Sequence, residues 1–244
     1  MSAKKNVKPS VTTKKTDNLI TTYMERSLHF DLKKKFCPDE TMHEQKIGRF
    51  VADACDGRTI YEIQTGNLAP LEKKLKFYLE NTNLDVVVVR PIAKKRVIYW
   101  LDKELGEFTR APRTSPRREY ITNGISDLFY VKDLLKSGRI TFKFLLMEID
   151  EIRLLDGYGV HKKIRATSVD RMAGEIFEEI TIRSVDDIKA IILPLLPNEK
   201  FTRDDLSRAL KLKALALWSA QKLLLELDIL DCEKDGRKLI FWKK

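Results

Sequence analysis

Apolar and polar positions follow two different periods along the chain, and the changes between them predict its elements. Apolar residues recur at helical spacing from Leu19 to Phe36, and Cys37-Pro38 then ends the run. Over residues 42–65 short stretches alternate, which predicts strands, and Asp56-Gly57 predicts a two-residue hairpin turn between two of them. Residues 69–82 return to helical spacing.

The middle of the chain predicts more strands. Residues 84–92 are β-branched and apolar on both faces, which is typical of a central strand, and residues 94–102 predict another. A helix is expected over 126–138, and strands over 140–155 and 175–183. Because strands and helices alternate in this order, the predicted fold class is α/β (α+β), a mixed sheet flanked by helices.

The last sixty residues have a different pattern. Ser184 and Thr202 each precede a short helical run with Asp in its first turn, and a longer apolar helix follows over 214–230. Two short strands around Asp235-Gly236 end the chain. Three helices and a hairpin predict a winged helix, with Lys222 as its candidate DNA contact. The third helix is unusually apolar for a recognition helix, so a structural or dimerising role is the alternative.

Length and charge give the domain plan and the class of partner. The 244 residues carry a formal net charge of +10, although charged residues of both signs make up 34%. We expect a disordered basic tail over 1–18, a first domain over 19–183 and a second over 184–244. An anionic partner is favoured, nucleic acid first, and a basic surface without a partner is the alternative.

Cysteine usage and hydropathy point to the compartment. Cys37, Cys55 and Cys232 lie far apart with no CxxC pairing, which indicates neither a disulfide framework nor a thiolate zinc site. No apolar signal core or membrane-length apolar window is present in the sequence. We therefore expect a cytoplasmic protein with no membrane partner.

The predicted hairpin brings polar residues together. With a turn at Asp56-Gly57, Asp53 faces Ile60, and Asp53, Glu62 and Gln64 project from one side. The two carboxylates are then diagonal neighbours, roughly 7 to 8 Å apart at the backbone, and can share a hard cation. The alternative is that these carboxylates simply face water, or that a slip of register separates them.

These residues resemble the PD-(D/E)XK restriction-endonuclease-like superfamily, in which an acid on one strand is followed across a turn by an acid-x-Lys motif. Asp53 matches the first acid, Glu62 the second and Gln64 the lysine. More closely, the chain resembles a group of prokaryotic proteins that join such a core to a winged-helix tail. The runs that carry this likeness are E-R-S-L-H, EIQTGN, KKL, R-P-I-A and R-x-S-P-R-R.

The resemblance implies a restriction-endonuclease-like core and a Mg²⁺- or Mn²⁺-dependent attack of water on a phosphodiester. Asp53 and Glu62 would hold the ion. Glu25 matches the place of an additional acid on the preceding helix, which makes it a further catalytic candidate. His29, one turn later, is a candidate donor to phosphate, with a packed or solvated histidine as the alternative.

The departure from the family pattern lies at Gln64, because glutamine contributes no positive charge where lysine is usual. Some active members are known to use glutamine there. Lys73 or Lys74 on the following helix is expected to supply that charge and contact DNA, with solvated lysines as the alternative. The loop residues Arg113, Arg117 and Arg118 are candidate phosphate contacts, or else a solvated loop.

Three functions follow from these patterns. The first is a metal-dependent endonuclease that binds double-stranded DNA through both domains, as a homodimer if it cuts both strands. The second is a DNA-binding or regulatory protein on a catalytically inactive nuclease fold. The third is a nonenzymatic assembly protein that dimerises through the apolar winged helix.

Overall fold

The computed structural model describes residues 27–157 and 166–244. The expected tail over 1–18 and the candidate Glu25 therefore lie outside the described residues. The first part contains α2 (Ser27–Phe36), β1 (His43–Ile47), β2 (Phe50–Cys55), β3 (Thr59–Ile63), α3 (Glu72–Asn81), β4 (Asp85–Asp102), β5 (Arg113–Thr114), α4 (Ile121–Asp127), β6 (Ile140–Leu155) and β7 (Thr167–Ile182). The second contains α5 (Val185–Ile192), β8 (Phe201–Thr202), α6 (Arg203–Leu210), α7 (Ala214–Glu226), β9 (Leu230–Asp235) and β10 (Lys238–Lys243).

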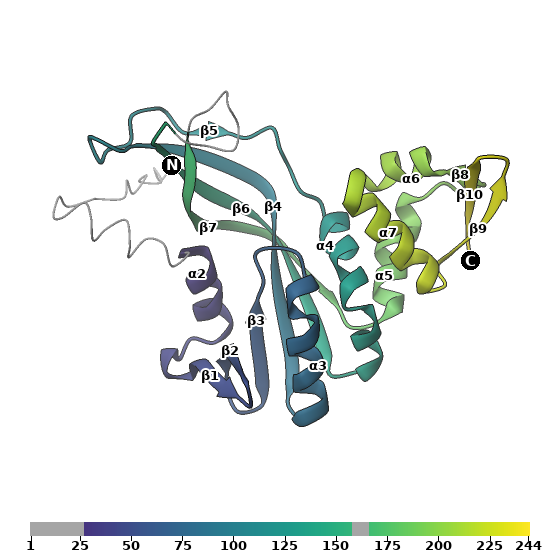
Figure 1. Cartoon of the computed structure of the whole chain (residues 1–244), viewed down its shortest axis with the longest axis horizontal. Coiled ribbons are helices and arrows are strands. Elements are labelled where there is room, and N and C mark those ends of the chain that lie inside the picture. The colour runs from purple at the N-terminus through teal and green to yellow at the C-terminus, as the bar shows by residue number, and fades with distance from the viewer. Residues whose placement is uncertain (1–26, 158–165) are drawn as a thin grey trace, which may run out of the picture.

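A mixed sheet forms the larger part of the molecule, and helices flank it, as the sequence predicted (Figure 1). Its strand order is β1-β2-β3-β4-β6-β7, and β5 pairs with β4. Strands β3, β4 and β6 run parallel, whereas the pairs β1-β2, β2-β3 and β6-β7 are antiparallel. The parallel strands are buried on both faces by helices, which explains their continuous apolar runs.

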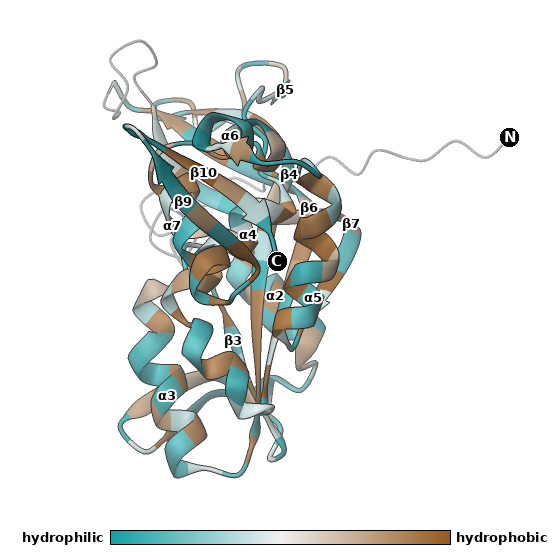
Figure 2. Cartoon of the chain, turned by 90° about the vertical axis from the view of Figure 1, so that its right-hand side faces the viewer, coloured by the Kyte–Doolittle hydropathy of each residue, from teal (hydrophilic) through white to brown (hydrophobic). Residues whose placement is uncertain are grey.

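The two faces of the sheet are covered by different helices (Figure 1). On one face α2 packs against β7 and β3 through Leu28 and Leu32, which join a core with Ile63 and Met147. On the other face α3 and α4 pack on β4 in a larger core. Figure 2 shows hydrophobic residues along the long strands and hydrophilic residues on the outer side of α6 and β9. Strand β3 therefore lies between helices that approach from opposite faces.

Several predicted elements differ in extent. The strand expected over 175–183 is the end of the longer β7, and the helix expected over 214–230 is α7, which ends at Glu226. The strands expected over 84–92 and 94–102 are one strand, β4, because it pairs along its whole length with β6 and absorbs the irregularity between Ala93 and Lys95. The helix expected over 126–138 is α4, which starts earlier at Ile121, followed by 3₁₀ turns over 128–130 and 132–137. Gly138 has a φ of 69° and ends this stretch.

The hairpin between β2 and β3 has a different register from the predicted one. Cys55 pairs with Ile60, and Ala54 with Tyr61. The Asp56 carboxylate accepts hydrogen bonds from the N–H groups of Arg58 and Thr59, so Asp56 precedes the reversal and Gly57, with a φ of 85°, lies at its tip. The turn lies at Gly57-Arg58, one residue after the predicted position, because the Asp56 N–H donates to the Thr59 carbonyl. The predicted pairing was therefore wrong by two residues, which leaves the faces of both strands unchanged.

The C-terminal part folds as helix, strand, helix, helix, strand, strand, with the sheet order β8-β10-β9. It packs on the first part chiefly through α7 against α4. The Thr122 hydroxyl donates to the Leu210 carbonyl at 2.7 Å, and the rings of Phe129 and Trp218 meet edge to face. This packing explains why the third helix is apolar on more than one side.

Candidate functional site

Asp53, on β2, is held by two donors from different elements. Its Oδ2 accepts from the backbone N–H of Ile63 at 2.7 Å and lies 3.2 Å from Nε2 of His29 on α2. Burial raises the pKa of Asp53, but the hydrogen bond and charge of His29 and the Ile63 N–H outweigh it, so the pKa lies below its ordinary value. Asp53 is therefore a carboxylate at neutral pH.

Glu62, on β3, is almost fully buried. Its Oε2 accepts from Nζ of Lys74 at 2.7 Å, and its Oε1 accepts from the hydroxyl of Tyr78 at 3.1 Å. Burial, together with the negative charge of Asp53, raises the pKa of Glu62 to about 7 in spite of Lys74 and Tyr78. The two acids thus differ strongly in their affinity for a proton.

The observed register explains how the two acids meet. Continuing the Ala54–Tyr61 pairing by one residue places Asp53 opposite Glu62, closer than the predicted diagonal arrangement. The backbone ladder ends there, and the Asp53 side chain takes the Ile63 N–H instead. Two carboxylates on one face then share a small space, which is why the charge of Asp53 contributes to the raised pKa of Glu62.

Helix α3 supplies the cation of the site. Lys74 and Tyr78 are four residues apart, so both lie on the face of α3 that packs over β3. The side chain of Lys74 is 19% exposed, whereas Lys73 is fully on the outer side. The ammonium group of Lys74 also lowers the pKa of Asp53 through its charge. Lys74 is therefore the basic member of a cluster with Asp53 and Glu62.

Gln64 does not join this cluster through its amide nitrogen. That nitrogen donates to the carbonyl oxygen of Asn67 at 2.6 Å and closes the loop after β3. The same loop is held by Arg90, whose guanidinium donates to the Thr65 carbonyl and pairs with Asp127 on α4 at 3.2 Å. Burial raises the pKa of Asp127 to about 6 in spite of Arg90.

The other predicted site residues lie on the surface. Arg113, Arg117 and Arg118 are exposed, and so are Lys73 and Lys222. His29 is bonded to Asp53 and is not directed freely at solvent, since its side chain is 24% exposed. Sequence reasoning missed Tyr78 as a partner of Glu62. Its spacing of four residues from Lys74 is the signal that would have found it.

The resemblance implies a divalent metal ion, and the site offers two carboxylates to hold one. Within the part of the chain that the structure describes, no three His, Cys, Asp or Glu side chains gather as a metal-binding group. Two carboxylates do gather, and Mg²⁺ is commonly held by one or two carboxylates together with waters and substrate phosphates. Among the described residues, the hydrogen bonds of Asp53 use Oδ2, so its Oδ1 can take another partner. The donor set thus fits Mg²⁺ or Mn²⁺.

Comparison with known proteins places the first part of the chain in a family. Residues 26–183 match the family model described as "Domain of unknown function (DUF8091)", which is more than half of the chain. The chain belongs to the DUF8091 family. The DUF8091 match ends directly before Ser184, the cap of α5, and contains Asp53, Glu62 and Lys74.

A relative of this DUF8091 chain is an uncharacterized protein of Treponema pallidum (strain Nichols). It is 29% identical over 191 residues, which cover 78% of this chain and 74% of the relative. No solved structure matches the chain. No helix in the described ranges combines the length and the apolar character that crossing a membrane requires.

Proposed function

We propose that this DUF8091 protein is a metal-dependent DNA endonuclease of the PD-(D/E)XK type. The observation that carries the proposal is the cluster of Asp53, Glu62 and Lys74, in which two carboxylates on adjoining strands meet one ammonium group from α3. An acid, a second acid and a lysine are the chemical set of that superfamily. Here the lysine comes from the helix, which compensates for the glutamine at position 64.

Each residue has a role that follows from its surroundings. Asp53 is ionised and offers Oδ1 as a hard ligand, while Glu62 offers a second carboxylate. A bound Mg²⁺ would lower the pKa of water and offset negative charge on the scissile phosphate. Lys74 places a positive charge beside both acids and is suited to contact the same phosphate. His29 orients Asp53 through its hydrogen bond.

The C-terminal part is proposed to be a winged helix that adds to DNA binding. Its order of helices and strands, with β8 pairing to β10, supports this assignment. Because α7 packs on α4, its face with buried Ser219 and Gln221 is not free for a DNA groove. DNA contacts are instead assigned to Arg113, Arg117 and Arg118 on the first part and to Lys222 on the exposed side of α7.

Cleavage of plasmid DNA tests the proposal. The purified protein with Mg²⁺ or Mn²⁺ is expected to cut DNA, and Glu62→Ala or Asp53→Ala to abolish the cutting. Glu80→Ala is the matched control, because Glu80 is an exposed carboxylate on α3 that pairs with Lys76 at the surface. A wild-type protein that does not cut, but binds DNA with an affinity that falls steeply from about 50 to 200 mM salt, would instead support the inactive DNA-binding scaffold.

That second function has one observation in its favour. Both oxygens of Glu62 are already bonded, to Lys74 and Tyr78, so a metal ion must compete with these donors. The unfolding temperature, measured with and without Mn²⁺, separates the two functions. If the ion binds between the acids, Mn²⁺ raises the unfolding temperature of the wild type and not that of Asp53→Ala.

A further inference from the structure

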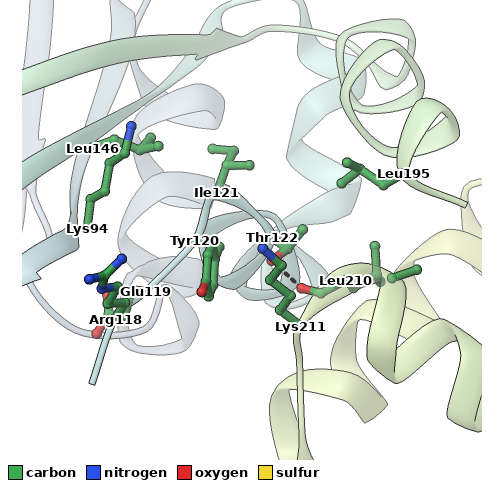
Figure 3. A pocket seen from close by; sticks show the side chains of 11 residues that line it. Lys94, Arg118, Glu119, Tyr120, Ile121, Thr122, Leu146, Leu195, Leu210 and Lys211 are labelled. Atoms are coloured by element: carbon green, nitrogen blue, oxygen red, sulfur yellow. Dashed lines mark hydrogen bonds between the residues drawn. The ribbon is translucent and has the colours of Figure 1, made fainter. Parts of the chain in front are cut away.

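A pocket lies where the two parts of the molecule meet, away from the acids. It has a volume of about 300 Å³ and is formed by β4, β6, the segment before and within α4, and the end of α6 (Figure 3). Residues of the C-terminal part, including Leu210 and Lys211, form one side of it. The Thr122–Leu210 hydrogen bond holds the two sides together. The volume of the pocket is suited to one small ligand and is too small for a DNA duplex.

The rim of this pocket is basic. Lys94, Arg118 and Lys211 line it and are all exposed, each from a different element or loop. Glu119 is the one carboxylate among the lining residues, and it is directed at Arg96, with 3.6 Å between their charged atoms. Three cations and one paired carboxylate leave a net charge of +2, which favours an anionic ligand.

The floor of the pocket is apolar and an aromatic ring stands beside it. Ile121, Leu146 and Leu195 contribute aliphatic surface, and Tyr120 is 38% exposed. Lys211 Nζ lies 4.5 Å from the centre of the Tyr120 ring. The basic rim is suited to bind a phosphate, and the Tyr120 ring and apolar floor are suited to bind a base. A nucleotide contains both groups.

The backbone of Lys211 has a left-handed conformation at the end of α6. Lys211 ends α6 with a φ of 55°, in the left-handed region where glycine is the least costly residue. A lysine at this position costs roughly 1 kcal/mol of backbone strain. Its side chain reaches the Tyr120 ring and the pocket, which gives the residue a local role.

The pocket lies on the face of β4 that also carries α3, because its lining residue Leu146 belongs to the same core as Val88 and Tyr78. Glu62 is in register with Val88, and Lys94 follows six residues along β4. At about 3.3 Å per residue, the pocket is roughly 20 Å from Glu62. This separation is one that a few nucleotides of a DNA strand can span.

We propose that this pocket binds one unpaired nucleotide of the DNA substrate, with its phosphate on Lys94, Arg118 and Lys211 and its base on Tyr120. The identification of the bound strand as DNA rests on the proposed function. It assigns the substrate class as DNA with a single-stranded extension. The C-terminal part then contributes to substrate choice through Lys211 and Leu210 as well as through its own surface.

Binding without metal tests the inference separately from cleavage. In EDTA, a duplex with a short single-stranded overhang is expected to bind more tightly than the same duplex with blunt ends. Tyr120→Leu should reduce that preference about five- to a hundredfold, the range for loss of one stacked base, and Tyr120→Phe should keep it. Lys94→Ala and Lys211→Ala should each lower the slope of log affinity against log salt by about 0.7 to 0.9.

Lys136→Ala removes an exposed charge on a 3₁₀ turn outside the pocket and should leave the overhang preference unchanged. Equal binding of blunt and overhang DNA would overturn the inference, as would an overhang preference that survives Tyr120→Leu. Thymidine monophosphate is a separate probe. If it binds in a Tyr120-dependent way while the overhang has no effect, the assignment to a DNA strand is wrong. None of these results depends on whether the protein cuts.

Discussion

Lys74 on α3 donates to Glu62 on β3 across 2.7 Å, so the ammonium group beside the acids comes from a helix and not from the strand that carries the motif. The strand position two residues after Glu62 holds Gln64, whose amide nitrogen closes a loop. A positive charge in an active site is defined by where its nitrogen lies, and either element can deliver it. For the proposed nuclease, Lys74 can therefore supply the charge that Gln64 lacks.

Replacing Lys74 tests this relationship directly. Lys74→Ala is expected to lower the rate of DNA cleavage in Mg²⁺ by about a hundredfold or more, because it removes the charge beside both carboxylates. Lys73→Ala is the matched control: it deletes an identical side chain one residue away on the outer side of α3. Initial rates of plasmid nicking for the two variants give the comparison. Equal losses, or no loss in either, would remove Lys74 from the site.

Gln64 should behave as a structural residue. Gln64→Ala removes the hydrogen bond to the Asn67 carbonyl and is expected to lower the free energy of unfolding by about 1 kcal/mol. Cleavage should fall only a few-fold, since the acids and Lys74 remain. Urea unfolding and nicking rates measured on the same preparation separate the two effects. A variant that is fully stable but as inactive as Glu62→Ala would show that the amide acts in catalysis.

The sequence predicted the elements of this fold better than their pairing. Hydrophobic runs located β6 at 140–155 without error, because a strand buried on both faces has a continuous apolar sequence. The hairpin register was wrong by two residues, since the hydrogen bonds of the Asp56 side chain decide where the chain reverses. A shift of two keeps each side chain on its face, which is why Asp53 and Glu62 still meet.

Contacts between residues far apart in the chain could not be predicted from the sequence. Arg90 and Asp127 are 37 residues apart and belong to a strand and a helix whose contact depends on the whole sheet. The local spacing of hydrophobic residues carries no information about such a pair. The choice between Lys73 and Lys74 likewise depends on how α3 is rotated about its axis over β3, which only packing fixes. Charge patterns could nominate both lysines, and the structure separates them.

The raised pKa of Glu62 predicts a pH dependence of stability. The folded state holds the Glu62 proton up to a pH of about 7, whereas the unfolded state releases it near 4.5. Between these values the folded state binds more protons, so the free energy of unfolding falls as pH rises. The pKa shift of Glu62 corresponds to a change of at most roughly 3 kcal/mol in the free energy of unfolding.

Glu62→Gln isolates that contribution. The amide keeps the shape of the side chain and does not ionise. Its oxygen can still accept from Lys74, while its nitrogen can donate to the hydroxyl oxygen of Tyr78. Urea unfolding at pH 5 and at pH 8 should show the wild type losing more stability than Glu62→Gln over this interval. Asp127 titrates in the lower part of the same window in both proteins and cancels in the comparison. Parallel pH profiles for the two proteins would mean that Glu62 titrates normally when folded.

The buried pair of Arg90 and Asp127 should be strongly coupled. Arg90 is 8% exposed and also donates to the Thr65 and Pro91 carbonyls, so Arg90→Met leaves a buried carboxylate and two acceptors without their donor. We expect a loss of about 3 to 5 kcal/mol of unfolding free energy for this variant. The double variant Arg90→Met with Asp127→Leu should lose less than the sum of the two single changes, by about 1 to 3 kcal/mol.

The exposed pair of Lys76 and Glu80 is the control for this cycle, because its charged atoms are 3.8 Å apart at the surface of α3. Lys76→Ala should change stability by less than about 0.5 kcal/mol. Arg90→Met should also slow cleavage more than its stability loss explains, since Arg90 holds the Thr65 carbonyl in the loop directly after Glu62 and Gln64. Additive single effects in the cycle would show that Arg90 and Asp127 act independently.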